Sequence, residues 1–202
     1  IQPGYGWVFP LGDGEVNLGV GALATASRPA NVAVKDLLRH YARSVRDSWA
    51  LEGDPRAVTS ALLPMGGAVS GLAGRNWAAV GDAAACVNPL NGEGIDYALE
   101  GGRLLADLVV AGGPGGDLTR AWPEVLRRNY GEAFAIARDA ARLLTYPRFL
   151  PLAGPVGMRS QTLMSAAVRC MSNTVAESDR DIVARGWRAA GSVARRFDRR
   201  PL

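Results

Sequence analysis

Two residue patterns in this chain of 202 residues could do chemistry, and the stronger one begins at Gly81-Asp82. An apolar run at residues 77–80 precedes the pair, a glycine-containing loop follows it, and helical spacing starts near Ile95. This order places a carboxylate beside a helix N-terminus, where backbone amides and the helix dipole attract electron-rich groups. A flavin dinucleotide needs both, because its ribityl hydroxyls donate hydrogen bonds and its ring carries electron-rich oxygens.

A Gly-Asp pair alone is weak evidence, since both residues are common in turns at strand ends. The residues that follow strengthen the interpretation. Asn88-Pro89 ends the extended segment, and Gly92 and Gly94 remove side chains just before the predicted helix. Unpaired amides at that helix start would suit the pyrimidine end of a flavin or a phosphate.

The second pattern lies at residues 3–10, where Tyr5, Trp7 and Phe9 alternate with small or aliphatic residues. Alternation predicts a strand with an aromatic face. Such a face most often packs into a core, so in isolation the core interpretation is favoured over a ligand contact.

Together the two patterns resemble a known family. Residues 81–95, GDAAACVNPLNGEGI, resemble the second flavin-binding motif of the geranylgeranyl reductase family, and Tyr-x-Trp-x-Phe-Pro resembles its substrate-domain signature. The family belongs to the flavoproteins similar to p-hydroxybenzoate hydroxylase. The resemblance implies that Asp82 contacts the ribityl chain, that residues 92–95 face the isoalloxazine ring, and that the aromatic strand lines a cavity for a polyprenyl chain.

The resemblance thus implies the following site residues. The cofactor contacts are Gly81, Asp82, Pro89, Gly92, Glu93, Gly94 and Ile95, and the substrate contacts are Tyr5, Trp7 and Phe9. The Pro64-Met65-Gly66-Gly67 loop is also expected near the flavin. Glu93, Asp96 and Tyr97 could relay a proton, but nothing in the sequence selects among them, so no catalytic residue is assigned.

The implied fold class is α+β or α/β, the C-terminal half of a flavoprotein. We expect part of a substrate domain at 1–68, the end of an FAD-binding domain at 69–116 and a helical region at 117–202. Periodicity predicts strands at 4–10, 15–22, 56–63 and 76–80, and helices at 32–49, 93–111, 119–145, 156–175 and 179–197. Asp13-Gly14 predicts the turn between the first two strands.

The chain lacks a site for the adenosine half of FAD. Gly19-Val20-Gly21 imitates a dinucleotide fingerprint, but no helix opens there and no acidic residue follows at the required distance. The chain also starts at Ile1 within a strand pattern. We therefore expect that an N-terminal half with the fingerprint is missing from this sequence.

Composition is that of an ordinary soluble protein, with 48% hydrophobic and 21% charged residues and a net charge of +4. We expect no metal and no nucleic-acid partner, a buried Cys86 and a solvated His40. The expected location is the cytoplasm, with peripheral contact to the cytoplasmic membrane as the alternative. Residues 179–197 combine an apolar stripe with many arginines, which fits a core-packing helix and, alternatively, a helix lying on anionic lipid. The stripe comprises Val183, Trp187, Ala190, Ala194 and Phe197.

The resemblance implies FAD-dependent reduction of isoprenoid double bonds. The substrates would be geranylgeranyl groups, archaeal-type lipids or, most specifically, the side chain of menaquinone, and the electron donor would be NAD(P)H or a redox protein. One alternative is a flavin monooxygenase or halogenase of the same superfamily. A second is a non-catalytic lipid-binding or membrane-docking module.

Overall fold

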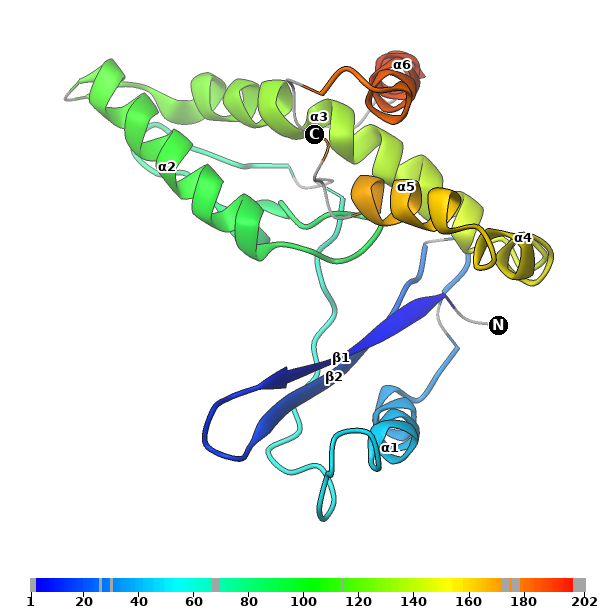
Figure 1. Cartoon of the computed structure of the whole chain (residues 1–202). Helices are drawn as coiled ribbons and strands as arrows, with labels where there is room; N and C mark the ends of the chain where they lie inside the picture. Colours follow the sequence, from blue (N-terminus) through cyan, green and yellow to red (C-terminus); the bar gives the residue numbers. More distant parts are fainter. Residues whose placement is uncertain are drawn as a thin grey trace.

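The computed structural model describes residues 3–25, 27–29, 31–66, 70–113, 115–171, 175 and 179–197. These residues form an α+β chain with a two-stranded antiparallel sheet and six α-helices. The elements are β1 (Gly4–Pro10), β2 (Val16–Ala22), α1 (Val34–Val45), the 3₁₀ helix η1 (Gly81–Ala84), α2 (Ile95–Gly112), α3 (Leu118–Leu144), α4 (Phe149–Gly157), α5 (Gln161–Met171) and α6 (Ile182–Phe197). Figure 1 shows the hairpin and α1 below a group formed by the other helices.

The β1–β2 hairpin carries α1 on one face and the aromatic side chains on the other. The strands predicted at residues 4–10 and 15–22 are confirmed, and β1 pairs with β2 so that Trp7 lies opposite Gly19. A Cβ atom added to Gly6 would lie 2.5 Å from the Tyr41 ring, so α1 packs directly on the sheet there. A Cβ atom on Gly19 would overlap the Trp7 ring. Because successive side chains alternate between faces, Tyr5, Trp7 and Phe9 lie on the face opposite α1.

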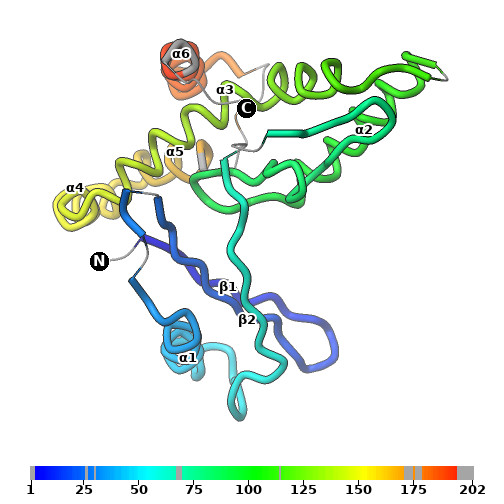
Figure 2. The backbone as a smooth tube through the Cα atoms, turned by 180° about the vertical axis from the view of Figure 1, so that it is seen from behind, coloured from blue at the N-terminus to red at the C-terminus, as the bar shows by residue number. Residues whose placement is uncertain are grey.

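Helix α1 ends at Val45, four residues before the predicted end, and turns follow at residues 46–50. The rest of the segment up to residue 66 has no regular secondary structure and connects α1 to the helical group, and Figure 2 shows it from behind passing the hairpin. Arg56 forms an ion pair with Glu15 at the hairpin turn. A strand was predicted at residues 56–63, and this prediction is wrong. Leu62 is 99% exposed, and among the described residues no neighbouring strand supplies hydrogen-bond partners, which extended backbone needs to form a sheet.

The main core lies between α2, α3 and the segment at residues 72–86. Tyr97 of α2 makes edge contacts at 5.1 Å with the rings of Tyr130 and Phe134 of α3. The Trp122 indole N–H donates to the carbonyl of Ala79 at 2.8 Å. The short strand predicted at residues 76–80 is reduced to one bridge between Ala73 and Ala78, because no longer strand lies beside it in the part of the chain that the structure describes.

The C-terminal helices differ from the sequence prediction. One helix was predicted over residues 156–175, but α4 ends at Gly157 and α5 begins at Gln161. Gly157 has a weak helix propensity, and the Ser160 hydroxyl accepts the amide of Leu163 at 3.3 Å, which starts a new helix. The end of the predicted helix, at residues 172–175, lies largely outside the described residues.

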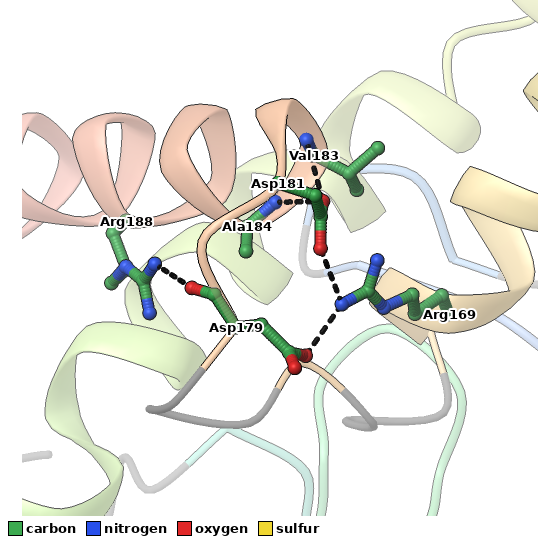
Figure 3. Close-up of polar contacts among 6 residues, drawn as sticks. All are labelled: Arg169, Asp179, Asp181, Val183, Ala184 and Arg188. Atoms are coloured by element: carbon green, nitrogen blue, oxygen red, sulfur yellow. Dashed lines mark hydrogen bonds and ion pairs between the residues drawn. The ribbon is translucent and has the colours of Figure 1, made fainter.

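A polar junction ties α5 to the start of α6 (Figure 3). Arg169 of α5 pairs with Asp179 at 2.5 Å and with Asp181 at 2.8 Å. Asp181 also caps α6 by accepting the amides of Val183 and Ala184. The Arg169 guanidinium and these amides lower the pKa of Asp181 to about 2. Arg188 of α6 donates to the Asp179 carbonyl, which ties the segment before α6 to the helix itself.

Helix α6 packs on α3 through Ala184 and Gly191, which are both buried. A Cβ atom on Gly191 would lie 2.5 Å from Cγ of Glu132 and 2.7 Å from Cδ1 of Ile136. Val183, Trp187 and Ala194 are half-buried and Ala190 is exposed, while the Phe197 side chain lies outside the described residues. The described residues of the predicted apolar stripe are therefore at most partly buried, and the two fully buried residues described in this helix lie outside the stripe.

We expect the substitution Gly191→Leu to destabilise the protein by about 1 to 3 kcal/mol, because the larger side chain forces α6 away from α3. Chemical denaturation monitored by circular dichroism measures the change. Gly186→Leu is the matched control on the same helix, since a Cβ atom there meets nothing within 4 Å. Equal stabilities of the two variants would contradict the packing assigned to Gly191.

Candidate functional site

The Gly-Asp pair forms the first turn of η1, which lies against α2. Gly81 has φ of +56°, a conformation that side-chain-bearing residues rarely adopt. A Cβ atom at Gly81 would also lie 2.9 Å from Cβ of Ala98 in α2. Gly81 therefore allows the acidic turn to approach the helix, and it does so for two independent steric reasons.

The Asp82 carboxylate lies beside the start of α2. A Cβ atom on Gly94, the N-cap residue, would lie 3.1 Å from Oδ1 of Asp82 and 3.2 Å from Cγ2 of Val87. Asp82 is exposed, and among the described residues no protein group donates to its carboxylate. The structure thus places an exposed carboxylate, without a donor among the described residues, beside a glycine at a helix N-terminus.

The first turn of α2 differs from the expected row of unpaired amides. Glu93 Oε1 accepts the amide of Ile95 at 3.0 Å, and Asp96 Oδ1 accepts the amide of Tyr97 at 2.8 Å. Two negative side chains thus cap the helix start themselves. Glu93 supplies an anion at the point where the sequence predicted a ligand oxygen, and a bound ligand would have to replace this cap.

The loop before α2 is held by Asn88, which the sequence interpretation did not single out as a positioning residue. Asn88 is buried; its side chain accepts the amide of Leu90 at 2.9 Å and donates to the Tyr97 hydroxyl at 3.2 Å. Its backbone exchanges further hydrogen bonds with Glu93 and Gly92. An Asn-Pro dipeptide indicates a turn, but the sequence could not reveal that Tyr97 would lie within reach.

Tyr5 joins the aromatic strand to this loop. Its hydroxyl donates to the carbonyl of Asn91 at 2.6 Å, across 86 positions of the sequence. A Cβ atom on Gly92 would lie 3.9 Å from the Tyr5 hydroxyl, 3.2 Å from Cδ1 of Leu63 and 3.8 Å from Sδ of Met65. Partial burial, and then the charge of Glu93, raise the pKa of Tyr5. The two motifs found in the sequence therefore meet at Asn91-Gly92.

The three aromatic side chains form a continuous row along β1. Ring centroids are 5.9 Å apart between Tyr5 and Trp7 and 6.4 Å apart between Trp7 and Phe9. The Trp7 indole N–H donates to Oδ1 of Asn17 at 2.9 Å, which fixes the ring over Gly19. Tyr5 is 52% and Phe9 59% exposed. In this chain the row is an open aromatic surface rather than a buried core.

The loop at residues 64–66 lies against the same motif, and Gly67 lies outside the described residues. The amide of Gly66 donates to the carbonyl of Val87 at 3.0 Å. The buried side chain of Arg138, in the C-terminal part of α3, donates to the carbonyl of Gly66. Sequence reasoning missed Arg138, because its role depends on α3 crossing this loop.

The proton-relay candidates differ in accessibility. The Tyr97 side chain is buried in the core, and burial raises its pKa to about 12. Asp96 is exposed, and partial desolvation raises the pKa of its carboxyl group above the usual value. Glu93 is exposed, and its charge contributes to the raised pKa of Tyr5. Among the three residues, only the two carboxylates can therefore reach a ligand at the helix start.

We expect the protein to lose stability as the pH rises from about 9 to about 12. Burial raises the pKa of Cys86 from 9.0 to about 12 and that of Tyr97 from 10.0 to about 12. Since both groups ionise more readily in the unfolded chain, their contribution is complete below pH 9 and falls by a few kcal/mol through the folded pKa values. Denaturation midpoints measured across this range test the prediction.

The variant Cys86→Ala separates the contribution of this thiol from that of Tyr97, and it should lose less stability at alkaline pH than the parent chain.

Two smaller predictions are confirmed: His40 is exposed and Cys86 is buried. Rapid alkylation of Cys86 in the folded protein would contradict its assignment as an unreactive core residue.

The chain is similar to curated reductases. No protein-family model matches the chain. No solved structure matches it. The chain is 32% identical over 148 residues to the digeranylgeranylglycerophospholipid reductase 1 of Methanopyrus kandleri, covering 71% of this chain and 39% of that protein. Together with the mycobacterial matches below, this similarity assigns the chain to the geranylgeranyl reductase family.

Within that family the chain is similar to menaquinone reductases. It is 60% identical over 201 residues to the menaquinone reductase of Mycobacterium tuberculosis and 60% identical over 200 residues to that of Mycolicibacterium smegmatis. The alignments cover 100% and 99% of this chain but only 48% and 49% of those proteins. The chain thus spans about half the length of these curated relatives and aligns with their C-terminal half.

Proposed function

We propose that this chain is one half of an FAD-dependent reductase, the half that faces the flavin ring and the substrate. The reductase saturates double bonds in an isoprenoid chain, and its substrate is the side chain of menaquinone. The observation that carries the proposal is the hydrogen bond from Tyr5 to Asn91. It brings the open aromatic row to the loop that presents Asp82 and Gly94. A cofactor held by the loop would therefore lie beside an apolar surface suited to a prenyl chain.

The residues at the loop fit the ribityl and ring portion of FAD. The Asp82 carboxylate has no protein donor among the described residues and can accept hydrogen bonds from ribityl hydroxyls. Gly92 and Gly94 leave the backbone accessible beside it. When bound, FAD supplies a hydride from its reduced ring to an alkene carbon, which is chemistry that the side chains cannot provide.

The residues of this chain bind the substrate, orient it and exclude water from it. Tyr5, Trp7 and Phe9 offer rigid aromatic area against which an isoprenoid chain loses its contact with water. Leu63 and Met65 extend this apolar surface toward Gly92. A proton must reach the second alkene carbon, and the exposed carboxyl groups of Glu93 and Asp96 are the groups at the helix start that can deliver one. The raised pKa of Asp96 favours its acid form.

The adenosine half of FAD needs residues outside this chain, which we assign to an N-terminal half like the uncovered part of the menaquinone reductases. Helix α2 has an exposed apolar face on which that half can pack, comprising Ile95, Leu99 and Val110. On this assignment residues 1–68 belong to a substrate domain, 69–116 to the FAD-binding domain and 117–202 to a C-terminal helical region.

Reconstitution tests the proposed function. The chain is co-expressed with the part of the Mycobacterium tuberculosis menaquinone reductase that the alignment leaves uncovered, and the purified complex is examined for flavin absorbance. We expect bound FAD and, under anaerobic conditions with a chemical reductant, saturation of one double bond in a menaquinone side chain detected by mass spectrometry.

A stable complex without flavin would contradict the cofactor assignment and favour a lipid-binding module. An oxygenated product formed in air would contradict the reductase assignment and favour a monooxygenase. A Trp7→Ala variant that retains flavin but loses substrate turnover would support the aromatic row as the substrate surface, whereas unchanged turnover would contradict it.

A further inference from the structure

We propose that α4 and α5 form a docking surface for an anionic lipid bilayer, a function that does not depend on the proposed catalytic site. This α4–α5 surface comprises the apolar residues Leu152, Val156, Met158, Leu163, Met164 and Val168 and the arginines Arg148 and Arg159. The exposure of its apolar side chains, its positive charge and its place in the fold all indicate a lipid bilayer as the partner.

The first argument is exposure. Helix α4 has the sequence FLPLAGPVG and carries no charged residue, yet none of its residues is buried. Leu152 is 74% and Met158, just after the helix, 77% exposed. On α5, Leu163 and Val168 are also exposed. Large apolar side chains exposed in this number on two successive helices indicate an interaction site.

The second argument is charge, and it selects the partner. Residues 140–176 contain four arginines and no aspartate or glutamate. Arg142 pairs with Asp139, and Arg169 pairs with Asp179 and Asp181. Arg148 and Arg159 lie exposed at the two ends of α4 and have no carboxylate partner in the part of the chain that the structure describes.

An apolar helix flanked by free arginines fits the interface of an anionic membrane. The apolar side chains can enter the boundary between headgroups and acyl chains, while arginine side chains reach back to lipid phosphates. Each basic residue near an anionic surface adds an electrostatic attraction to the lipid headgroups. Among the described helices, none has the length and apolar character needed to cross a bilayer.

The third argument is position. Figures 1 and 2 both place α4 at the outer end of the helical group, away from α2 and η1. A bilayer that contacts α4 at this end can therefore lie away from α2. For residues 179–197 the sequence left lipid binding open as an alternative to core packing, and α6 uses Ala184 and Gly191 to pack on α3.

Vesicle co-sedimentation of the full chain tests this proposal. The probes are phosphatidylcholine vesicles with and without phosphatidylglycerol. We expect binding to the anionic vesicles only. The double variant Leu152→Asp/Val156→Asp should lower the partition coefficient by at least about tenfold, since two apolar side chains of this size no longer enter the lipid. Arg148→Glu/Arg159→Glu should cause a similar loss, which high salt reproduces in the parent chain.

Two control variants locate the surface. Ile182→Asp removes a residue of α6 that is 85% exposed, and Arg128→Glu reverses an exposed charge on α3. Both should bind vesicles like the parent chain. All the altered residues are exposed, so circular dichroism should show unchanged folding.

The proposal is overturned if the parent chain does not bind anionic vesicles, or if the α4 variants bind as well as the parent. Loss of binding in the Ile182 variant alone would assign the lipid surface to α6 instead. If the α4 variants change only the oligomeric state in size-exclusion chromatography, the surface contacts a protein and the lipid proposal is wrong. The catalytic proposal is unaffected by any of these outcomes, since its tests are flavin content and turnover.

Discussion

Substitution of Asp82 by alanine is expected to weaken FAD binding by about 10- to 150-fold in the reconstituted complex. The carboxylate is exposed beside Gly94 and has no protein donor among the described residues, so its hydrogen-bonding capacity is available to a ligand. Hydrogen bonds to a charged group contribute about 1.5 to 3 kcal/mol each, which corresponds to this range of affinity. Flavin release followed by fluorescence during dilution measures the loss.

Three observations decide whether the effect belongs to the site. The stability of Asp82→Ala should equal that of the parent chain, because the side chain supports no described contact within the protein. Asp82→Asn should lie between the two in affinity, since it keeps an acceptor oxygen without the charge. Asp47→Ala, which removes an exposed carboxylate in the turn that follows α1, is the matched control. Unchanged flavin affinity in Asp82→Ala would contradict the ribityl assignment.

The second large effect is expected from Gly81→Ala, which should destabilise the fold by about 2 to 5 kcal/mol. The left-handed backbone costs a side-chain-bearing residue about 1 to 2 kcal/mol. Overpacking against Ala98, whose Cβ atom would be 2.9 Å away, adds about 1 to 3 kcal/mol. Urea denaturation of the chain measures the loss without any need for cofactor.

Two further variants separate these causes. Gly71 has φ of +77° and nothing within 4 Å of an added Cβ atom, so Gly71→Ala should show the backbone cost alone. Adding Ala98→Gly to Gly81→Ala removes the steric clash and should recover part of the stability, although glycine weakens α2 by about 1 kcal/mol. Equal effects of Gly71→Ala and Gly81→Ala would show that the approach of η1 to α2 is not tight.

These two predictions assign different roles to the neighbouring residues Gly81 and Asp82. Gly81 has a structural role, because it lets η1 contact α2, whereas Asp82 faces outward and is available for a ligand. The same division occurs on β1, where Gly6 admits α1 on one face while Trp7 contributes to the open row on the other. In both places a glycine brings two elements together, and the adjacent functional side chain gains its position from that contact.

Sequence reasoning succeeded where the information is local. The alternation in residues 4–10 and 16–22 predicted the hairpin, because a strand shows its period within a few residues. Helical spacing likewise predicted α2 and α3 to within about two residues of their observed bounds. The strands predicted at 56–63 and 76–80 failed for a different reason. A strand is completed by hydrogen bonds to a neighbour, and sequence periodicity does not reveal whether that neighbour is present.

The sequence by itself determined the types of groups available for chemistry: an acidic turn, a glycine-containing loop and an aromatic strand, with family membership then supported by similarity to known reductases. Only the tertiary structure decided that Tyr5 meets Asn91 and that Arg138 holds Gly66. It also decided that α6 packs on α3 while α4 stays exposed. The physical reason is common to all these cases. Contacts between residues distant in the chain depend on how whole faces pack, and packing is a property of the assembled elements rather than of any one segment.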